Sequence, residues 1–197
     1  EDAIKMFMKA KELQPNHQNS YYNLALIKKE QGQSEEAIEL LLKVLNLNPE
    51  HKDAKIHAQR DFNDLGIKLH QERDYKLALK YFKIVVVLAP REYFGYYNMG
   101  NTYYEMEDYE NAKAFFKKAI EFKPEYESVH SNLGATYRHL GKTERSLSCY
   151  DKAININPKN ASNYYGRAVT FKDAERKEDA EENYRKAISL DPKHIGS

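Results

Sequence analysis

Proline spacing is the feature that most restricts what this chain can fold into. The six prolines are Pro15, Pro49, Pro90, Pro124, Pro158 and Pro192. Their successive separations are 34, 41, 34, 34 and 34 residues, and each proline ends a similar phrase such as "KVLNLNP", "KAIEFKP" or "KAISLDP". Because proline lacks a backbone N–H and resists helix continuation, each phrase is predicted to end a helix. The spacing therefore indicates a helical repeat of 34 residues, with seven extra residues in the one longer interval.

Small and large side chains also recur at fixed distances before these prolines. In one repeat, Ala112, Phe116 and Ala119 lie twelve, eight and five residues before Pro124. Residues with these spacings share one helix face, where small side chains admit a neighbouring helix and the aromatic ring fills the gap. The equivalent residues elsewhere are Ala3, Phe7 and Ala10; Ala37, Leu41 and Val44; Ala78, Phe82 and Val85; Ser146, Tyr150 and Ala153; and Ala180, Tyr184 and Ala187.

The first half of each repeat carries a second apolar stripe. Tyr96, Met99 and Gly100 form it in the repeat that ends at Pro124. Turn signals such as "EQGQSEEA", "MEDYENA" and "HLGKTERS" separate the two stripes. Each unit is therefore predicted to be a hairpin of two short amphipathic helices.

These columns resemble tetratricopeptide repeats. The family pattern has an aromatic residue, Leu-Gly or Leu-Ala, then Tyr, Ala, Phe or Tyr, Ala and Pro, and "YYNMGNTYYEMEDYENAKAFFKKAIEFKP" follows it at nearly every position. The resemblance implies an all-α fold, a right-handed superhelical solenoid of helix–turn–helix units whose first helices line a concave groove. His130 replaces the leading aromatic residue, Arg167 the leucine, and Arg73, Glu107 and Glu175 the turn glycine. We expect looser packing at those positions.

The repeat pattern divides the chain into units. Complete repeats are assigned to residues 18–51, 59–92, 93–126, 127–160 and 161–194. Residues 1–17 match the second helix of a truncated repeat, and 195–197 form a tail. Because no terminal cap is recognised, we expect the parent protein to extend in both directions.

Residues 52–58 are the insertion between two repeats. Seven residues make about two helical turns, so Ala54, Ala58 and Phe62 stay on one face. We therefore expect the insertion to extend the next helix towards its N-terminus. A flexible loop is the alternative.

In each pair of adjacent tyrosines, one is predicted to face the core and the other the groove. Tyr96 and Tyr103 occupy packing columns, whereas Tyr97 and Tyr104 are predicted to face the groove. Five other tyrosines are predicted to lie in the core, namely Tyr21, Tyr137, Tyr150, Tyr164 and Tyr184.

One column facing the groove is rich in asparagine. It reads Asn23, Asp64, Asn98, Asn132 and Gly166. A carboxamide both donates and accepts hydrogen bonds, so asparagines stacked one per repeat could hold an extended peptide by its backbone. The column is similar to the asparagine ladder of O-GlcNAc transferases, although Asp64 and Gly166 interrupt it. The alternative is that these asparagines brace adjacent helices.

The predicted peptide-binding residues combine these amides with neighbouring tyrosines, which add apolar contact with a polar tip. They are Tyr22, Asn23, Phe94, Tyr97, Asn98, Asn101, Tyr104, Asn132, Arg138 and Tyr165. An acidic ligand would be favoured by the basic residues of one column, Lys29, Arg138 and Lys172. The alternative is a mixed, solvated face, because acidic residues such as Asp173 lie beside them in the sequence.

The sequence does not match the carboxylate clamp. With this site, some members of the family bind the acidic C-termini of heat-shock chaperones. The clamp needs a lysine, two asparagines, then a lysine and an arginine over three repeats. Asn101 and Asn132 fit, but Tyr97, Ser162 and Gly166 stand at the cationic positions. We therefore do not expect a carboxylate-clamp chaperone adaptor.

Composition argues against several other classes of protein. The 31 basic and 30 acidic side chains nearly cancel, and no basic stripe follows the repeat, so we expect neither nucleic acid nor a membrane as partner. Because phosphate-loop, HExxH, CxxC and nucleophile-elbow motifs are missing, catalysis, cofactors and metal ions are not expected. A single cysteine, Cys149, excludes an internal disulfide and points to an intracellular, cytoplasmic location.

The sequence thus predicts a non-enzymatic protein–protein interaction module or scaffold that binds a peptide or protein segment in its concave groove. One alternative is a substrate-recognition or regulatory region of a larger enzyme, such as a glycosyltransferase. The other is a structural scaffold that self-associates through uncapped ends.

Overall fold

The computed structural model describes residues 16–192, and the regular elements among them are ten α-helices, with no strand. The chain forms two compact units, residues 1–90 and 91–197, which are described one at a time. The segments predicted as a truncated N-terminal repeat and a C-terminal tail lie largely or wholly outside the described residues.

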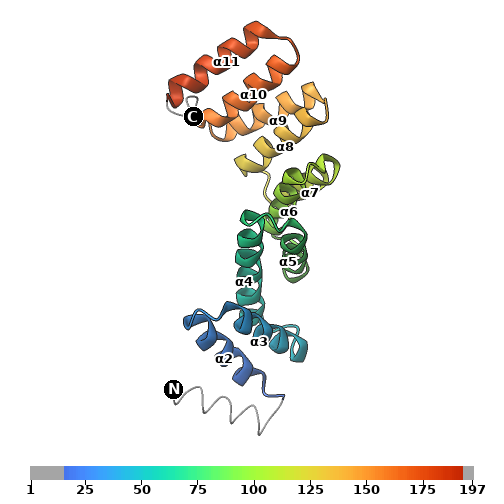
Figure 1. Ribbon diagram of the computed structural model, residues 1–197, viewed down its shortest axis with the longest axis vertical. Helices are drawn as coiled ribbons and strands as arrows, with labels where there is room; N and C mark the ends of the chain where they lie inside the picture. The colour runs from blue at the N-terminus through green and yellow to red at the C-terminus, as the bar shows by residue number, and fades with distance from the viewer. Residues whose placement is uncertain (1–15, 193–197) are drawn as a thin grey trace. The chain divides into compact units, whose positions relative to one another are not determined.

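The first unit consists of helices packed in chain order. They are α2 (Gln18–Glu30), α3 (Ser34–Leu47), α4 (Lys52–Gln71) and α5 (Tyr75–Leu88). The pairs α2–α3 and α4–α5 form hairpins, and α3 also packs against α4 (Figure 1). Asp74 caps α5, because its side chain accepts a hydrogen bond from the Leu77 amide at 3.1 Å.

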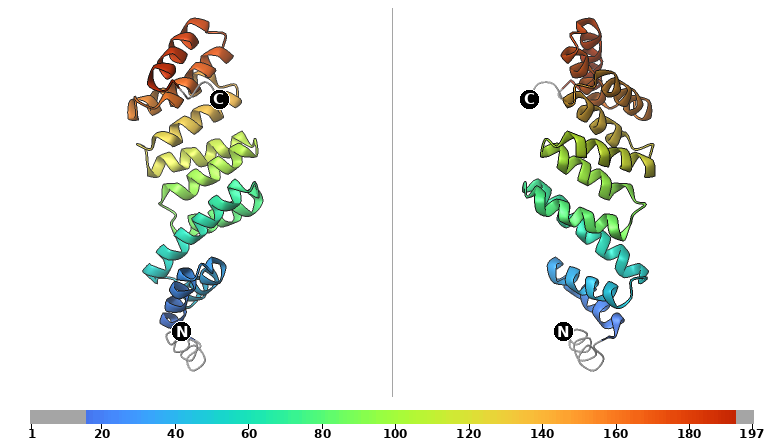
Figure 2. Two further views of the ribbon diagram at one scale, coloured as in Figure 1. Left: turned by 60° about the vertical axis from the view of Figure 1, so that its left-hand side comes forward. Right: turned by 90° about the vertical axis from the view of Figure 1, so that its right-hand side faces the viewer.

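The second unit repeats the hairpin three times. Its helices are α6 (Tyr93–Glu105), α7 (Tyr109–Phe122), α8 (Glu127–His139), α9 (Thr143–Ile156), α10 (Ala161–Asp173) and α11 (Lys177–Leu190). The antiparallel pairs α6–α7, α8–α9 and α10–α11 can be followed in Figure 2. The first helices are also neighbours, since α6 contacts α8 and α8 contacts α10. The prediction of an all-α helical repeat solenoid is confirmed.

The insertion at residues 52–58 is helical and forms the beginning of α4. This helix has 20 residues, against 13 for each of the first helices α2, α6, α8 and α10. Ala54 and Ala58 are completely buried, so the added turns contribute to the core. His51 caps the helix by accepting a hydrogen bond from the Ala54 amide at 3.3 Å.

The core lies where small residues and an aromatic ring bring helices close together. Ala112, Phe116 and Ala119 of α7 are completely buried. The Phe116 ring lies against Gly100 of α6, where an added Cβ atom would be 2.6 Å from the ring. This contact therefore requires glycine at position 100. The predicted core position is also confirmed for Tyr21, Tyr137, Tyr150 and Tyr164, whereas Tyr184 is half-buried.

One departure from the repeat pattern, His130, is accommodated by a hydrogen bond. His130 is only 5% exposed, and its Nε2 lies 2.6 Å from the carbonyl oxygen of Pro124. The Tyr164 hydroxyl, 34 residues later, donates to the carbonyl of Pro158 at 3.2 Å. His130 thus takes the structural place of an aromatic residue, and the looser packing expected there is not found.

The turns within the hairpins all contain a residue with positive φ. The values are 75° at Gly32, 64° at Arg73, 59° at Glu107, 67° at Gly141 and 59° at Glu175. A side chain in this left-handed region costs about 1–2 kcal/mol relative to glycine. The turns without glycine therefore have the same geometry as those with glycine, but they carry local backbone strain at Arg73, Glu107 and Glu175.

Replacing Glu107 by glycine should stabilise the protein by about 1 kcal/mol, because glycine adopts this conformation without the Cβ penalty. The free energy of unfolding in urea measures the change. Gly141→Ala is the matched reverse variant, since an added Cβ atom would meet nothing within 4 Å there. It should destabilise by a similar amount, and equal stabilities of both variants and the parent would contradict this account.

Candidate functional site

An asparagine pair links the first helices of two successive repeats in the second unit. Asn132 of α8 donates from its Nδ2 to the Oδ1 of Asn101 on α6 at 2.7 Å. The same Nδ2 lies 3.4 Å from the hydroxyl of Tyr97, also on α6. All three side chains are half-buried, so they are shielded by their neighbours and still reach the surface. Three of the ten predicted binding residues are therefore in direct contact.

This pair leaves one donor and one acceptor without a partner among the described residues. Asn132 uses its amide nitrogen as a donor, while its own Oδ1 accepts no hydrogen bond. Asn101 uses its Oδ1 as an acceptor, while its Nδ2 donates none. A carboxamide oxygen and a carboxamide nitrogen are the groups that pair with the N–H and C=O of a peptide bond. The pair thus has the hydrogen-bonding capacity of one peptide unit.

Aromatic rings continue from Tyr97 towards the start of α6. The Tyr97 ring meets the Tyr126 ring edge-on at 5.3 Å between centroids, and Tyr126 meets Tyr93 at 4.9 Å. Phe94 lies 6.0 Å from Tyr93, also edge-on, and the Lys123 Nζ is 4.3 Å from the centre of the Tyr93 ring. Burial is the main cause that raises the pKa of Tyr126. Sequence reasoning had identified Tyr97 and Phe94 but not Tyr93 and Tyr126.

Arg138 is held in an ion pair, and its neighbours form a polar cluster. Its guanidinium Nη1 lies 2.9 Å from Asp173 Oδ2 on α10. Desolvation lowers the pKa of Arg138, but the hydrogen bond and charge of Asp173 outweigh it and raise that pKa overall. Burial raises the pKa of Tyr104, and the nearby Arg138 opposes that shift. Burial and Arg138 lower the pKa of His139, whose ring stacks on Tyr109 at 4.5 Å. Because Arg138 is paired with Asp173, this surface fits the expected mixed, solvated face better than a binding site for acidic ligands.

Other predicted binding residues have contacts of their own. Tyr22 and Asn23 belong to α2 of the first unit, where the Tyr22 ring lies 5.0 Å from His51 and 5.9 Å from His57. Asn98 on α6 is half-buried, and its backbone carbonyl accepts from Thr102 at 2.8 Å. Tyr165 on α10 is 41% exposed, and its ring meets Tyr184 edge-on at 5.6 Å.

Other asparagines brace helices around one carboxylate. Glu127, at the start of α8, accepts from Asn157 at 2.8 Å, from Asn163 at 2.6 Å and from Asn160. Asn163 is 1% exposed and also accepts from the Ser131 hydroxyl. These contacts join α8 to the loop before α10 and to α10 itself. These three asparagines, which lie outside the predicted column, therefore brace neighbouring elements.

Gly166 stands in the asparagine column because the Tyr150 ring occupies the space that a side chain at this position would need. A Cβ atom at Gly166 would lie 2.5 Å from the Tyr150 ring and 2.6 Å from its hydroxyl oxygen. One repeat earlier, Phe116 stands in place of Tyr150 and Asn132 in place of Gly166. At position 166 the Tyr150 ring therefore leaves no room for a side chain on α10.

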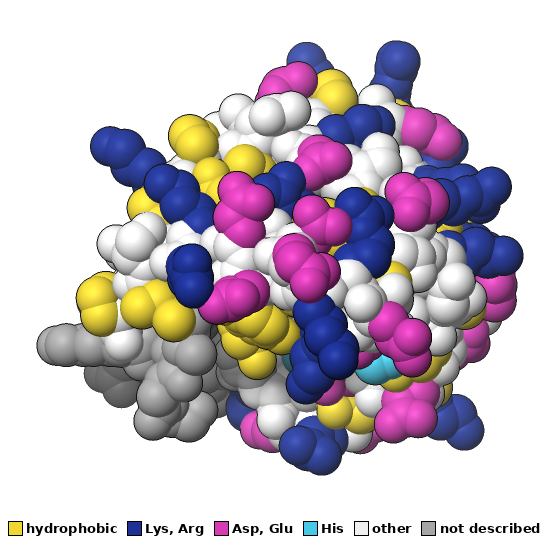
Figure 3. Space-filling model, turned by 90° about the horizontal axis from the view of Figure 1, so that it is seen from above, with side chains coloured by type: hydrophobic (Ala, Val, Ile, Leu, Met, Phe, Trp, Pro, Cys, Tyr) yellow, Lys and Arg dark blue, Asp and Glu magenta, His cyan; other side chains and the backbone are white. Residues whose placement is uncertain are grey.

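Metal ligation, membrane spanning and surface charge can each be examined in the described residues. Within residues 16–192, no cluster of three or more His, Cys, Asp or Glu side chains could hold a metal ion. None of the helices in that range has the length and apolar character needed to cross a lipid bilayer. On the face shown in Figure 3, basic and acidic side chains are interspersed.

Cys149 should be unreactive in the folded protein, because burial raises the pKa of its thiol to about 11 and the thiolate is the reactive form. A chromogenic disulfide reagent at neutral pH should label it slowly in native protein and rapidly in urea. Labelling of the native protein as fast as of the unfolded chain would contradict this expectation.

Glu127→Ala should destabilise the second unit by about 1–3 kcal/mol, because three carboxamides lose their shared acceptor. Urea unfolding followed by circular dichroism measures the loss. Glu125→Ala, which changes an exposed carboxylate two residues away, is the matched control. Equal losses in the two variants would show that the network contributes nothing.

Comparisons with known proteins agree with the repeat geometry. A family model described as tetratricopeptide repeat matches residues 93–126, and a second one with the same description matches residues 125–193. A model described as regulator of microtubule dynamics protein 1-3 matches residues 1–70. No curated protein matches the chain.

Solved structures share this fold over most of their length. The structure of YrrB, described as a TPR protein with an unusual peptide-binding site, is 22% identical; the match covers 96% of this chain and 94% of that one, with a TM-score of 0.72. A crystal structure of MamA is 21% identical over 86% of this chain and 95% of that one, with a TM-score of 0.67. A MamA RS-1 double mutant is 19% identical over 100% and 99%, also with a TM-score of 0.67. At these identities the likeness concerns the fold.

Proposed function

Because the chain belongs to the tetratricopeptide repeat family, we propose that it is a protein-interaction module that binds an extended polypeptide segment along α6 and α8. The proposed site consists of Tyr97, Asn101 and Asn132, with the tyrosines at positions 93 and 126 beside them. Phe94 and Tyr104 lie on the same helix α6 and are proposed to extend the surface.

The observation that carries this proposal is the pairing of Asn101 with Asn132. Their mutual hydrogen bond fixes both carboxamides and leaves one acceptor and one donor, Asn132 Oδ1 and Asn101 Nδ2. A peptide bond in an extended segment would donate its N–H to the first and accept from the second. Because the two amides are already oriented, less side-chain entropy is lost on binding than for two free asparagines.

The neighbouring groups favour an uncharged or weakly charged segment. The rings of Tyr93, Tyr97 and Tyr126 offer apolar contact with polar tips. Arg138, the one cation among the predicted binding residues, is paired with Asp173. Specificity for an acidic ligand is therefore not part of the proposal. The description of YrrB as having a peptide-binding site is consistent with this use of the fold.

The test begins with peptides selected from a random display library against the full chain. In the best binder, each backbone amide is methylated in turn, and affinity is measured by fluorescence anisotropy. Methylation at one amide should weaken binding about tenfold, because the Asn132 Oδ1 loses its donor. In the Asn101→Ala, Asn132→Ala variant, the affinity should fall by a similar factor and the effect of methylation should disappear.

Asn155→Ala is the matched control, since Asn155 is an exposed asparagine of α9. Circular dichroism verifies that both variants remain folded. A selected peptide that binds the double variant as tightly as the parent would rule out the asparagine pair as the binding site.

A further inference from the structure

Four aromatic rings lie edge to face in a row beside the asparagine pair. We call them the aromatic surface, which consists of Tyr93, Phe94, Tyr97 and Tyr126. All four side chains are half-buried, so part of each ring remains accessible. Tyr97 joins the aromatic surface to the amides, because its hydroxyl lies 3.4 Å from the Nδ2 of Asn132. A segment held by the asparagine pair therefore meets these rings next.

Lys123 shows what kind of group these rings attract. Its Nζ lies 4.3 Å from the centre of the Tyr93 ring and 5.0 Å from the centre of the Tyr126 ring. The face of an aromatic ring carries partial negative charge, so it attracts an electropositive group. Lys123 itself is exposed. The two ring faces that it covers are therefore within reach of a ligand that displaces the ammonium group.

A polypeptide lying on these rings meets few acceptors for its backbone. The Asn132 Oδ1 can accept from one N–H, and the aromatic surface beside it offers mainly ring carbons. A backbone N–H that a ring covers and that lacks an acceptor costs free energy. Proline has no N–H and avoids this cost, while its carbonyl can accept from a tyrosine hydroxyl. The aromatic surface therefore favours proline close to the residue that the amides hold.

Proline also suits these rings in shape and in conformation. Its compact apolar ring can lie flat on an aromatic face, where the C–H groups beside its nitrogen meet the negative charge of that face. Segments rich in proline adopt the extended polyproline II conformation before they bind, so they lose little entropy on aromatic-lined surfaces. The rings therefore distinguish such a segment from other extended polypeptides.

The length of the site sets the spacing of the prolines. Tyr93, Tyr97 and Asn101 are four residues apart on α6 and so follow one helix face. The helix rises about 12 Å from the first of them to the last. A polyproline II segment rises about 3.1 Å per residue and covers this length in about four residues. Prolines are therefore expected within about four residues of the N–H that binds Asn132.

We propose that the segment bound along α6 and α8 contains proline, and that its proline rings lie on Tyr93 and Tyr126 in the place of the Lys123 ammonium group. This inference rests on the proposed function, because the asparagine pair holds the residue of the segment that donates an N–H. Lys123 leaves the rings when the segment binds, so it competes with the ligand.

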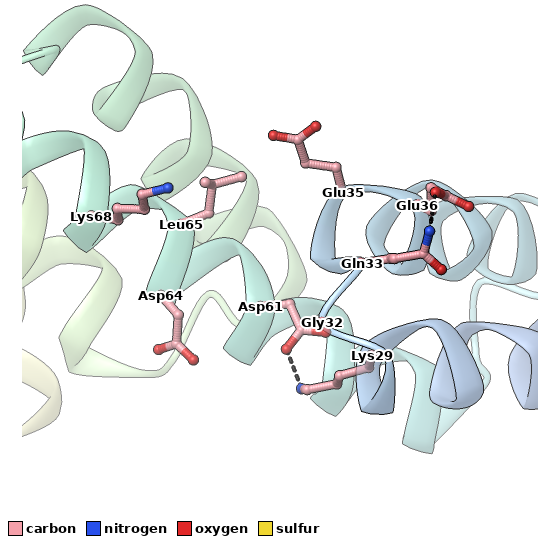
Figure 4. Close-up of a pocket in the computed structure, with 9 residues that line it drawn as sticks. All are labelled: Lys29, Gly32, Gln33, Glu35, Glu36, Asp61, Asp64, Leu65 and Lys68. Atoms are coloured by element: carbon pink, nitrogen blue, oxygen red, sulfur yellow. Dashed lines mark hydrogen bonds and ion pairs between the residues drawn. The ribbon is translucent and has the colours of Figure 1, made fainter.

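A cavity in the first unit differs in chemistry and serves as an internal control. Its volume is about 510 Å³, and it opens between α4 and the turn that joins α2 to α3 (Figure 4). Leu65 is the one apolar side chain among the nine residues that line it, and Lys29 is paired with Asp61 there. None of these nine residues is aromatic. A peptide rich in proline should therefore leave this cavity unaffected.

The probe is acetyl-Pro-Pro-Pro-Ala-Pro-Pro-Pro-amide, in which the alanine supplies the one N–H inside the peptide. It is titrated into isotope-labelled full chain and followed by amide chemical shifts. Saturable shifts should appear at residues 93–101 and 123–132, and not at residues 32–36 and 61–68 around the cavity. A peptide of the same length with alanine at every position should bind about tenfold more weakly, because its N–H groups find no acceptors on the rings.

The outcomes separate this inference from the proposed function. Equal affinity of the two peptides, or no saturable shift with the proline peptide, would overturn the preference for proline and leave the selected peptides to test the asparagine pair. Replacing the central alanine by N-methylalanine removes the N–H and should weaken binding about tenfold. Unchanged affinity in that peptide would count against the asparagine pair.

Lysine variants test the competition directly. Lys123→Ala should strengthen binding of the proline peptide about threefold, because no ammonium group then covers the rings. Lys117→Ala, which removes an exposed lysine of α7, is the matched control and should leave the affinity unchanged. Equal affinities of the two variants would overturn the displacement of Lys123. Tyr93→Leu should weaken binding about fivefold; if it does not fold, Lys123→Ala decides, since misfolding does not strengthen binding.

Discussion

Close approach between helices is the constraint on which the rest of this structure depends. A hairpin of two short helices cannot bury both faces, so each one gains stability by packing on the next. The contact is made by a ring between small residues, as when Phe116 lies against Gly100. This packing places successive first helices side by side in the second unit, where α8 contacts both α6 and α10. The surface that these first helices present together is therefore a product of core packing.

Polar contacts add a second layer of connection between the first helices. Asn132 reaches Asn101 on the preceding first helix, while Arg138 reaches Asp173 on the following one. Both contacts join residues roughly one repeat apart in the sequence. Such links act only between nearest neighbours, so disturbing one is expected to affect chiefly the adjoining hairpins. A binding surface built from them is fixed locally, within one unit.

Sequence periodicity predicted the features that recur and missed those that occur once. The helical hairpins and the buried positions of Ala112 and Phe116 repeat with the prolines, so the pattern revealed them. Tyr126 lies two residues after Pro124, a position that is Glu92 after Pro90, so no column marked it. The three amide donors to Glu127 likewise depend on side-chain directions across a repeat boundary. Spacing alone does not encode those directions.

The space shared by Tyr150 and Gly166 limits how freely these repeats could be exchanged. The ring at the core position of one repeat reaches the groove position of the next, so the two residues must change together. A tyrosine ring placed before Asn132 in the way that Tyr150 is placed before Gly166 would clash with the Cβ atom of Asn132. A shuffled array of these repeats should therefore keep the second helix that carries Tyr150 together with the first helix that carries Gly166.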